Sequence, residues 1–293
     1  MQKLLALLCI IAACFLVLPE RVEGQSRGAT GAQGLAADAL ANMDAAFNST
    51  NDQLTPQDAY YLGRAVAANI LSIYKPYTRS PALTQYVNRI CQTLAINSSR
   101  PVAYNGYHVI ILDSAEFNAF ATSGGHIFIT KGLAETAASE DMLAAIIAHE
   151  LAHIILGHSV DMINEMRFTN EMSAAADRAA DIAARNSASA KQFAQFRDSV
   201  TKTIDTMLKN GYSQSQEFDA DREAMALLAS AGYDSSALID MLRVLQRVQT
   251  SQKGGFNTTH PSPRERIANV EKLRYRVPDT RRYRTPRFKN MQF

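Results

Sequence analysis

One short stretch of the chain, Ala148-His149-Glu150-Leu151-Ala152-His153, places two histidines and a glutamate within a long apolar segment. Residues four apart on a helix share one face, so the side chains of His149 and His153 can bind one metal ion. Two neutral imidazoles leave room for a third protein ligand and a water molecule. Glu150 lies about 100° around the helix from His149, where it can accept a proton from that water without being a ligand. The stretch therefore predicts a zinc site with Glu150 as its general base.

The surroundings of this stretch favour a functional role over a chance match. Residues 142–155 are apolar on almost every side, which predicts a buried helix. Two histidines and a glutamate cost free energy in such a helix unless something binds them, and a metal ion with its water does so. His158 comes five residues after His153 and would point away from the metal on a continuous helix. We therefore interpret it as a structural histidine at the helix end.

The third ligand must come from another segment. Ser213 and Gln216 have the spacing of a capping box, which predicts a helix that begins just before Glu217. Glu217 and Asp221 are four apart on one face of that helix, so one carboxylate can bind the metal while the other orients a ligand histidine. Asp219 points elsewhere and is interpreted as part of a solvated face. Glu217 is the best candidate from the residues alone, although other acidic residues follow the histidine motif.

The remaining pattern predicts an α+β fold that is mostly α, with a small sheet beside the metal helix. The predicted elements are helices at 56–74 and 81–94, strands at 108–112 and 125–130, and helix over most of 138–248 with breaks near 210–211 and 232. Gly124-Gly125 is expected to form the turn between the two strands. Cys91 lies among apolar residues at helical spacing, so we expect a small core residue rather than a nucleophile.

The beginning of the chain predicts a targeting segment. Residues 1–24 contain a basic start, an apolar run at 4–18 and small residues at a cleavage site, as in a secretory signal peptide. An uncleaved anchor and a lipidated Cys14 are the alternatives. We therefore expect secretion, most simply to the periplasm, with membrane association as a second option. The expected divisions that follow are a linker at 25–52, the metal-binding domain at 53–276 and a basic tail at 277–293.

Charge limits the partners that the sequence predicts. The formal net charge is only +2, which argues against a nucleic-acid partner. The C-terminal tail interleaves arginines and a lysine with aromatic residues. This pattern predicts either a solvated, disordered tail or a segment that binds an anionic membrane surface or an envelope polymer.

Five segments occur in the order in which they occur in a known family. They are the helix start at Leu54–Arg64, the motif Phe117-Asn118-Ala119-Phe120-Ala121 with the strand after it, the stretch Ala148–His153, the motif Glu217-Phe218-Asp219-Ala220-Asp221, and the segment His260–Arg266. On these segments the chain resembles the family-48 zinc metallopeptidases of the gluzincin group, which include HtpX-type quality-control proteases, CAAX prenyl proteases and BepA-like proteins. With its predicted signal peptide, it is most similar to the secreted, periplasmic BepA-like branch. Thr122-Ser123 departs from the family, which commonly has proline before the two glycines, and this can alter the rim of the cleft.

The resemblance implies a gluzincin-type metallopeptidase domain over 53–276 that binds one Zn²⁺ per chain. It implies Glu217 as the third metal ligand and Asp221 as its supporting carboxylate. Through the Asn-Ala-Phe motif it also places Asn118 beside the residues that hold the metal. His260 and Arg266 are implied as donors to the oxyanion that forms during peptide hydrolysis.

These expectations combine into a zinc metalloendopeptidase that hydrolyses peptide bonds in extended or misfolded envelope proteins, and so serves protein quality control. The strand that ends at Thr130 is expected to offer an edge to which a substrate peptide adds as an extra strand. The alternative is an envelope assembly factor or chaperone whose metal site is normally closed. Two closure devices are considered, namely a fourth metal ligand from His260 and a helix at Ser173–Ala190 that covers the site.

Overall fold

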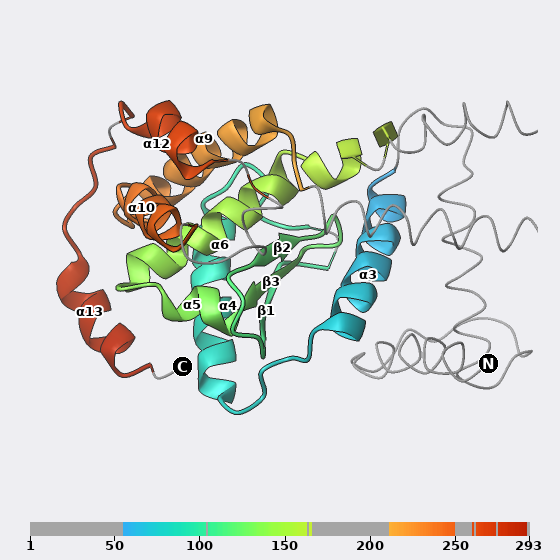
Figure 1. Ribbon diagram of the computed structural model, residues 1–293, viewed down its shortest axis with the longest axis horizontal. Helices are drawn as coiled ribbons and strands as arrows, with labels where there is room; N and C mark the ends of the chain where they lie inside the picture. The colour runs from blue at the N-terminus through green and yellow to red at the C-terminus, as the bar shows by residue number, and fades with distance from the viewer. Residues whose placement is uncertain are drawn as a thin grey trace, which may run out of the picture.

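The computed structural model describes residues 55–103, 105–162, 164–165, 211–249, 260, 262–273 and 275–291 (Figure 1). The predicted signal peptide (1–24), the linker (25–52) and the alanine-rich helix (173–190) lie outside the described residues. Among the helices inside these ranges, none combines the length and the apolar character that crossing a membrane requires.

Three short strands form one mixed sheet, with helices on both of its faces (Figure 1). The strands are β1 (His108–Leu112), β2 (Ala119–Ala121) and β3 (His126–Thr130), in the spatial order β1-β3-β2. The helices are α3 (Pro56–Ile73), α4 (Pro81–Ile96), α5 (Lys131–Glu135), α6 (Glu140–Ile155), α9 (Gln214–Ser230), α10 (Ala237–Gln249), α12 (Pro263–Val270) and α13 (Arg281–Lys289). This mostly helical architecture with a small sheet confirms the predicted fold class.

The turn at Gly124-Gly125 joins β2 to β3, and not the two strands that the sequence predicted. β1 and β3 run parallel, so a tight turn cannot connect them. The missed strand, β2, is antiparallel to β3 and has only three residues, two of them alanine, which gives little strand signal. Gly125 has a φ of +86°, which glycine adopts without steric cost. The substrate edge predicted for the strand ending at Thr130 is also wrong, because β3 is paired on both sides.

Alternate side chains of β3 pack against different helices. Ile127 and Ile129 belong to the main core cluster, together with residues of α4 and α6. Phe128 points to the opposite face and packs with Val66 and Ile70 of α3. Figure 1 shows α3 on one side of the sheet and α4 and α6 on the other. The sheet is therefore the middle layer of the domain.

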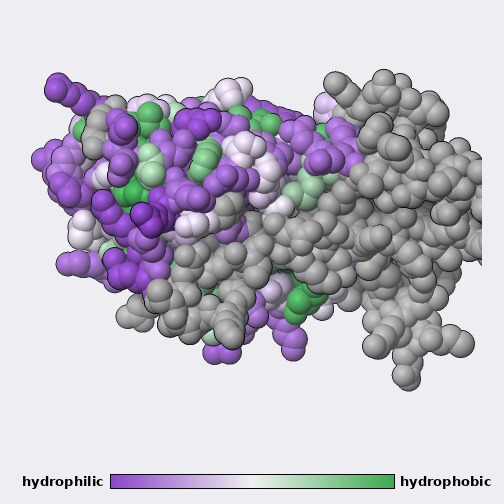
Figure 2. Space-filling model, turned by 45° about the horizontal axis from the view of Figure 1, so that its top comes forward, coloured by the Kyte–Doolittle hydropathy of each residue, from purple (hydrophilic) through white to green (hydrophobic). Residues whose placement is uncertain are grey.

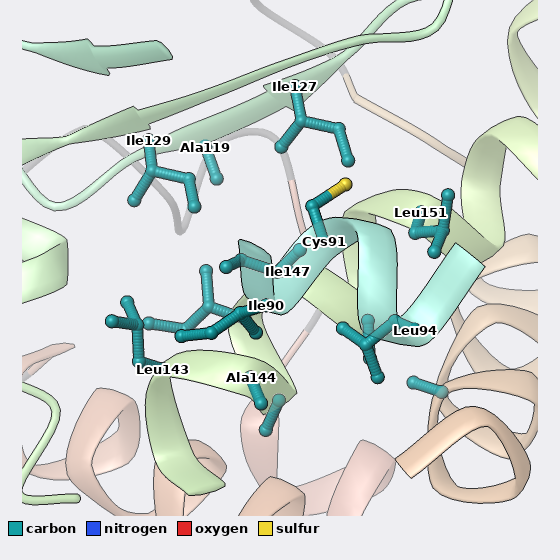
Figure 3. Packing of buried hydrophobic residues seen from close by; sticks show 14 of the residues in the cluster. Ile90, Cys91, Leu94, Ala119, Ile127, Ile129, Leu143, Ala144, Ile147 and Leu151 are labelled. Carbon is teal, nitrogen blue, oxygen red and sulfur yellow. The ribbon is translucent and has the colours of Figure 1, made fainter. Parts of the chain in front are cut away.

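Figure 3 shows the interior between α4, α6 and β3. Cys91 of α4 lies there between Ile127 of β3 and Leu151 of α6, with Leu94 one turn further along α4. Its side chain is fully buried, and burial raises the pKa of the thiol to about 12. The prediction of Cys91 as a core residue rather than a nucleophile is confirmed. On the outside, the coloured surface in Figure 2 is mainly hydrophilic, as expected when apolar side chains gather in the core.

Helix α6 carries the two histidines of the motif and is enclosed by protein. Its residues from Glu140 to Ile154 are all buried, as the sequence predicted. The hydroxyl of Ser139 caps the helix by accepting a hydrogen bond of 3.2 Å from the N–H of Met142. The helix ends at Ile155, and Gly157 turns the chain with a φ of +80°. α9 packs along α6 and brings a second set of polar residues to it.

Helix α13 packs against the beginning of α6 through ion pairs with two buried acidic residues. The guanidinium of Arg284 donates to the two carboxylate oxygens of Asp141 at 2.8 and 3.2 Å. Arg287 donates to Glu140, which also accepts a hydrogen bond of 2.6 Å from the hydroxyl of Tyr86. The expectation of a disordered tail is therefore wrong for this segment, which is mostly exposed but forms a helix with two arginines bound to the acidic first turn of α6.

The ion pair of Arg284 should contribute measurably to stability. Arg284→Ala leaves the carboxylate of Asp141 buried without its ion-pair partner, so we expect the free energy of unfolding to fall by about 3 kcal/mol. Urea unfolding of the purified chain measures this change. Arg281→Ala is the matched control, because that arginine lies on the same helix but is exposed and pairs with the exposed Asp279. Equal unfolding midpoints for Arg284→Ala and the wild type would show that α13 does not stabilise the domain.

Candidate metal centre

Four buried side chains converge beside α6. They are His149 and His153 of α6, Glu217 of α9 and His260. Each offers one possible ligand atom, and these four atoms all lie within 4.8 Å of one another. The Nε2 atoms of His149 and His153 are 3.2 Å apart. Each of these nitrogens lies 3.4 Å from a carboxylate oxygen of Glu217. The structure thus brings together the three predicted ligands and the residue considered as a fourth.

These distances fit a single ion of the size of zinc. Ligand atoms that lie about 2.0–2.2 Å from a tetrahedral metal ion lie about 3.3–3.6 Å from one another. The spacings among the two histidine nitrogens and the oxygens of Glu217 are close to that edge length. Two imidazole nitrogens and a carboxylate oxygen are also a donor set found in catalytic zinc sites. The residues present therefore fit a metal ion.

The local sequence sets the direction of each ligand. His149 and His153 share one face of α6 because they are four residues apart. On α9 the predicted capping box is confirmed, since Ser213 Oγ accepts from the N–H of Gln216 at 3.4 Å and Gln216 Oε1 accepts from the N–H of Ser213 at 3.1 Å. This cap fixes where α9 begins and so places Glu217 in its first turn, next to the two histidines.

A buried ion pair joins α9 to α12 beside the ligands. The Nε and Nη2 atoms of Arg266 donate to the two oxygens of Asp221 at 2.8 and 2.6 Å, and Nη1 lies 3.1 Å from Glu217 Oε2. Burial would raise the pKa of Asp221, but the charge and hydrogen bonds of Arg266 outweigh it and lower the pKa to about 2. In Glu217 the charges of His260 and Arg266 likewise overcome burial and hold the pKa well below its usual range. Both carboxylates are therefore anionic.

The two ligand histidines differ in their surroundings. Asp221 Oδ1 lies 3.0 Å from His149 Nδ1, which leaves Nε2 of that ring to face the cluster. Burial and the charge of Arg266 would lower the pKa of His149, but hydrogen bonds to Asp221 and Glu217 outweigh them and raise it to about 9. Burial lowers the pKa of His153 to about 3, so this ring is neutral, as a metal ligand must be. The two carboxylates thus attract positive charge to the point that a metal ion would occupy.

Glu150 lies beside the ligands and faces a small cavity. The cavity has a volume of about 30 Å³, and its walls include Glu150, Tyr212, His260 and strand β2. Both carboxylate oxygens of Glu150 are buried, and neither makes a hydrogen bond within the part of the chain that the structure describes. Burial raises the pKa of this carboxyl group. Because a cavity of this size can hold a water molecule, Glu150 can exchange a proton with one there.

His158 returns to the site, contrary to the sequence prediction that it points away. Its Nδ1 lies 2.9 Å from Nδ1 of His153, on the ring whose other nitrogen faces Glu217. The prediction assumed a continuous helix, whereas α6 ends at Ile155 and the chain turns at Gly157. His158 is thus a helix-end histidine, as expected, but one that orients the ring of His153.

Two further residues at the site were not identified from the sequence. The ring of Tyr212 stacks on His153, with 3.9 Å between the ring centroids and 14° between the ring planes. The hydroxyl oxygens of Tyr212 and Ser159 are 2.7 Å apart. Burial raises the pKa of Tyr212, so its phenol is neutral. In the sequence, Tyr212 could have been noticed only from its position directly before the N-cap residue Ser213. An apolar residue at that position often packs against the helix that follows it.

The other three residues predicted for the site, His260, Arg266 and Asn118, have different surroundings from one another. His260 lines the cavity beside Glu150. Arg266 is only 1% exposed, and its guanidinium is engaged with the carboxylates of α9. Asn118 precedes β2, where its side-chain oxygen accepts a hydrogen bond of 3.0 Å from the N–H of Ala119. Asn118 therefore belongs to the sheet edge, outside the four-residue ligand cluster.

The cluster should hold about one metal ion per chain. His149→Ala and Glu217→Ala each remove a ligand, so we expect both variants to lose the metal. Metal analysis of the purified proteins by plasma mass spectrometry measures the content. His108→Ala is the control, because that histidine lies on β1, outside the ligand cluster, and should keep full occupancy. Full occupancy in Glu217→Ala would instead move the third ligand to another residue.

The chain is similar in sequence to known metalloproteases. Residues 81–274 match peptidase family M48. The beta-barrel assembly-enhancing protease of Escherichia coli (strain K12) is 25% identical over 197 residues, which are 67% of this chain and 39% of that protein. The metalloprotease LoiP of the same strain is 26% identical over 197 residues, covering 66% of this chain and 72% of that protein. The mitochondrial metalloendopeptidase OMA1 of Schizosaccharomyces pombe is 27% identical over 190 residues, covering 64% of this chain and 52% of that protein.

The chain spans less than half the length of the first of these relatives. The family match, in contrast, covers most of the present chain and includes the ligand cluster, Glu150 and Arg266. The chain therefore belongs to peptidase family M48, whose members are metal-dependent.

Proposed function

We propose that the chain is a zinc-dependent endopeptidase that cleaves extended or misfolded proteins of the cell envelope. The observation that carries this proposal is the state of Glu150, a buried carboxylate beside the ligand cluster that makes no hydrogen bond to the described residues. A structural glutamate buried in this way would need a partner to offset the loss of hydration. A general base needs oxygens that are available to a water molecule, which is the arrangement at this cavity.

The proposed reaction divides the work among named side chains. His149, His153 and Glu217 would hold the zinc ion, and Asp221 keeps the ring of His149 in place. Zinc, when bound, activates a water molecule and polarises the carbonyl group to be attacked. Glu150 accepts a proton from that water and then passes it to the nitrogen of the leaving amine, so that no proton is gained or lost overall.

Strand β2 offers an edge for an extended substrate. The N–H of Thr122 and the carbonyl of Asn118 both bond to β3. Because the backbone groups of successive strand residues alternate between the two sides, those of Ala119 and Ala121 point away from β3. β2 also lines the cavity that contains Glu150. We therefore infer that an extended peptide adds to β2 rather than to the strand named from the sequence.

The proposed location in the envelope and the proposed class of substrate are supported by observations outside the metal centre. The Escherichia coli relative is named for beta-barrel assembly. This chain carries the pattern of a secretory signal peptide at residues 1–24. Both observations support a role in the envelope, and an edge strand selects chains that are extended rather than folded.

Replacement of the general base tests the proposal. Glu150→Gln keeps the size of the side chain but cannot accept the proton, so we expect cleavage of fluorescently labelled unfolded casein to fall by about 10²- to 10⁴-fold. The metal content and melting temperature should stay unchanged. Glu135→Gln, an exposed glutamate of α5 that pairs with Lys131, serves as the control and should cleave normally. A chelator should abolish cleavage by the wild type, and comparable turnover in Glu150→Gln would refute the base assignment.

A second candidate function is an envelope assembly factor or chaperone with a closed metal site. The position of His260 favours it, because a ring nitrogen of His260 lies within 4.8 Å of the ligand atoms of the other three residues. In the structure its Nδ1 is hydrogen-bonded to Glu217 Oε1 at 2.7 Å, which keeps the ring beside the cluster. Four protein ligands close a zinc site, whereas three leave a position for water. In the closed form His260 would be the fourth ligand, and the peptidase would be latent until His260 withdraws.

His260→Ala separates closure from a role in the reaction. If His260 closes the site, the variant should cleave unfolded casein faster than the wild type while it keeps its zinc. If His260 donates to the oxyanion, cleavage should fall by about 10²- to 10³-fold, again with zinc retained. Initial rates and metal content, measured on the same samples, distinguish these results. An unchanged rate would exclude both roles.

A further inference from the structure

Tyr212 connects the ligand cluster to strand β2. Its ring stacks on His153, and its hydroxyl oxygen lies 3.5 Å from the carbonyl oxygen of Ala121. The same hydroxyl is 2.7 Å from Ser159 Oγ, which is buried. Tyr212 also lines the cavity that contains Glu150. The side chain of Tyr212 therefore contacts the ligand His153, the cavity beside Glu150 and the edge strand β2.

The direction of these hydrogen bonds follows from the groups involved. The carbonyl of Ala121 can only accept, so in the hydrogen bond between the two groups the hydroxyl of Tyr212 is the donor. The hydroxyl of Ser159 can then donate to the oxygen of Tyr212, which orients the phenol toward β2. At 3.5 Å the bond to Ala121 is long for a hydroxyl donor and hence weak. The bond can be broken by rotation of the hydroxyl hydrogen about the C–O bond, while the ring stays stacked on His153.

The carbonyl of Ala121 is also the group that an incoming strand would use. It points to the outer side of β2, away from β3, because the neighbouring Thr122 bonds inward. A peptide that adds to this edge must donate a backbone N–H to an outward carbonyl of β2. A carbonyl oxygen can accept two hydrogen bonds, so the competition is for space. The phenol oxygen of Tyr212 lies 3.5 Å from the Ala121 oxygen, on the outer side from which the peptide N–H must approach.

We propose that Tyr212 is an edge-blocking residue, whose hydroxyl occupies the Ala121 carbonyl in the resting protein and is displaced when a peptide binds. This inference rests on the proposed function, because it requires a peptide substrate at β2. Tyr212 then sets selectivity and takes no part in bond cleavage. A segment that is extended over several residues can offset the lost hydrogen bond with its own backbone bonds, whereas a short or folded segment cannot.

Tyr212→Phe tests the competition because it removes the hydroxyl and keeps the stacked ring. We would measure binding of a fluorescently labelled, extended ten-residue peptide to the zinc-loaded full chain carrying Glu150→Gln, so that the peptide is not cleaved. The additional Tyr212→Phe change should lower the Kd by about two- to fivefold, the value of a weak hydrogen bond. In the chain with Glu150 intact, KM should fall by the same factor while kcat stays unchanged.

A matched control removes a hydroxyl of the same kind at a distant position. The hydroxyl of Tyr107 donates to the carbonyl of Arg100 at 2.7 Å, and Tyr107→Phe should leave the Kd of the peptide unchanged. Zinc content and melting temperature should be equal in the wild type and in Tyr212→Phe.

Other outcomes overturn the inference. An unchanged or higher Kd in Tyr212→Phe would show that the hydroxyl does not block the edge. A lower kcat at constant KM would assign it to the transition state instead. If the wild type binds the peptide but cleaves no unfolded protein, the proposed function fails while the binding comparison still decides the role of Tyr212. Absence of peptide binding in all variants would overturn both.

Discussion

The guanidinium of Arg266 is a cation buried in the core, and the arrangement of the site depends on how its charge is balanced. Arg266 is 1% exposed and forms a two-point ion pair with Asp221. Glu217 lies beside it as a second carboxylate, so one guanidinium faces two buried negative charges. Arg266 alone cannot balance both, and the raised pKa of His149, about 9, shows that the two carboxylates also attract a proton. A metal ion held by Glu217 and the two motif histidines would supply this positive charge in place of the proton. The same pair also joins α12 to α9, which fixes the carboxylates relative to α6.

The resting site restricts both chemistry and substrate binding. The cavity beside Glu150 has a volume of about 30 Å³, enough for a water molecule but far too small for a peptide. His260 occupies the ligand cluster, and the hydroxyl of Tyr212 occupies an acceptor of the edge strand. In the closed form that we propose, His260 would limit access to the metal and Tyr212 would limit access to β2. The proposed envelope protease would work among unfolded proteins that it must not all destroy, and two separate restrictions would suit that setting.

Much of the centre could be predicted because helical spacing is a local property. The positions of His149 and His153 on α6, and of Glu217 after its capping box, require only that each helix forms. Glu217 itself was one of several candidates until the family resemblance selected it, because the sequence alone does not state how α9 packs against α6.

Features that depend on contacts between distant segments could not be predicted in this way. β2 is too short to show a strand pattern, so the turn at Gly124-Gly125 was assigned to the wrong pair of strands. His158 was misplaced because the end of α6 at Ile155 carries no strong stop signal other than Gly157. The helix in the basic C-terminal segment was missed because its partner, the acidic first turn of α6, lies more than a hundred residues earlier in the chain.

The measurement that tests the central claim most directly is anomalous diffraction from crystals of the full chain at the zinc absorption edge. A single strong peak bounded by His149, His153 and Glu217 is the predicted result, and its loss below the edge would identify the element as zinc. A fourth bond from His260 would show the closed form directly. A well-ordered cluster with no anomalous peak, in protein purified without chelator, would contradict the assignment of these residues as a metal centre.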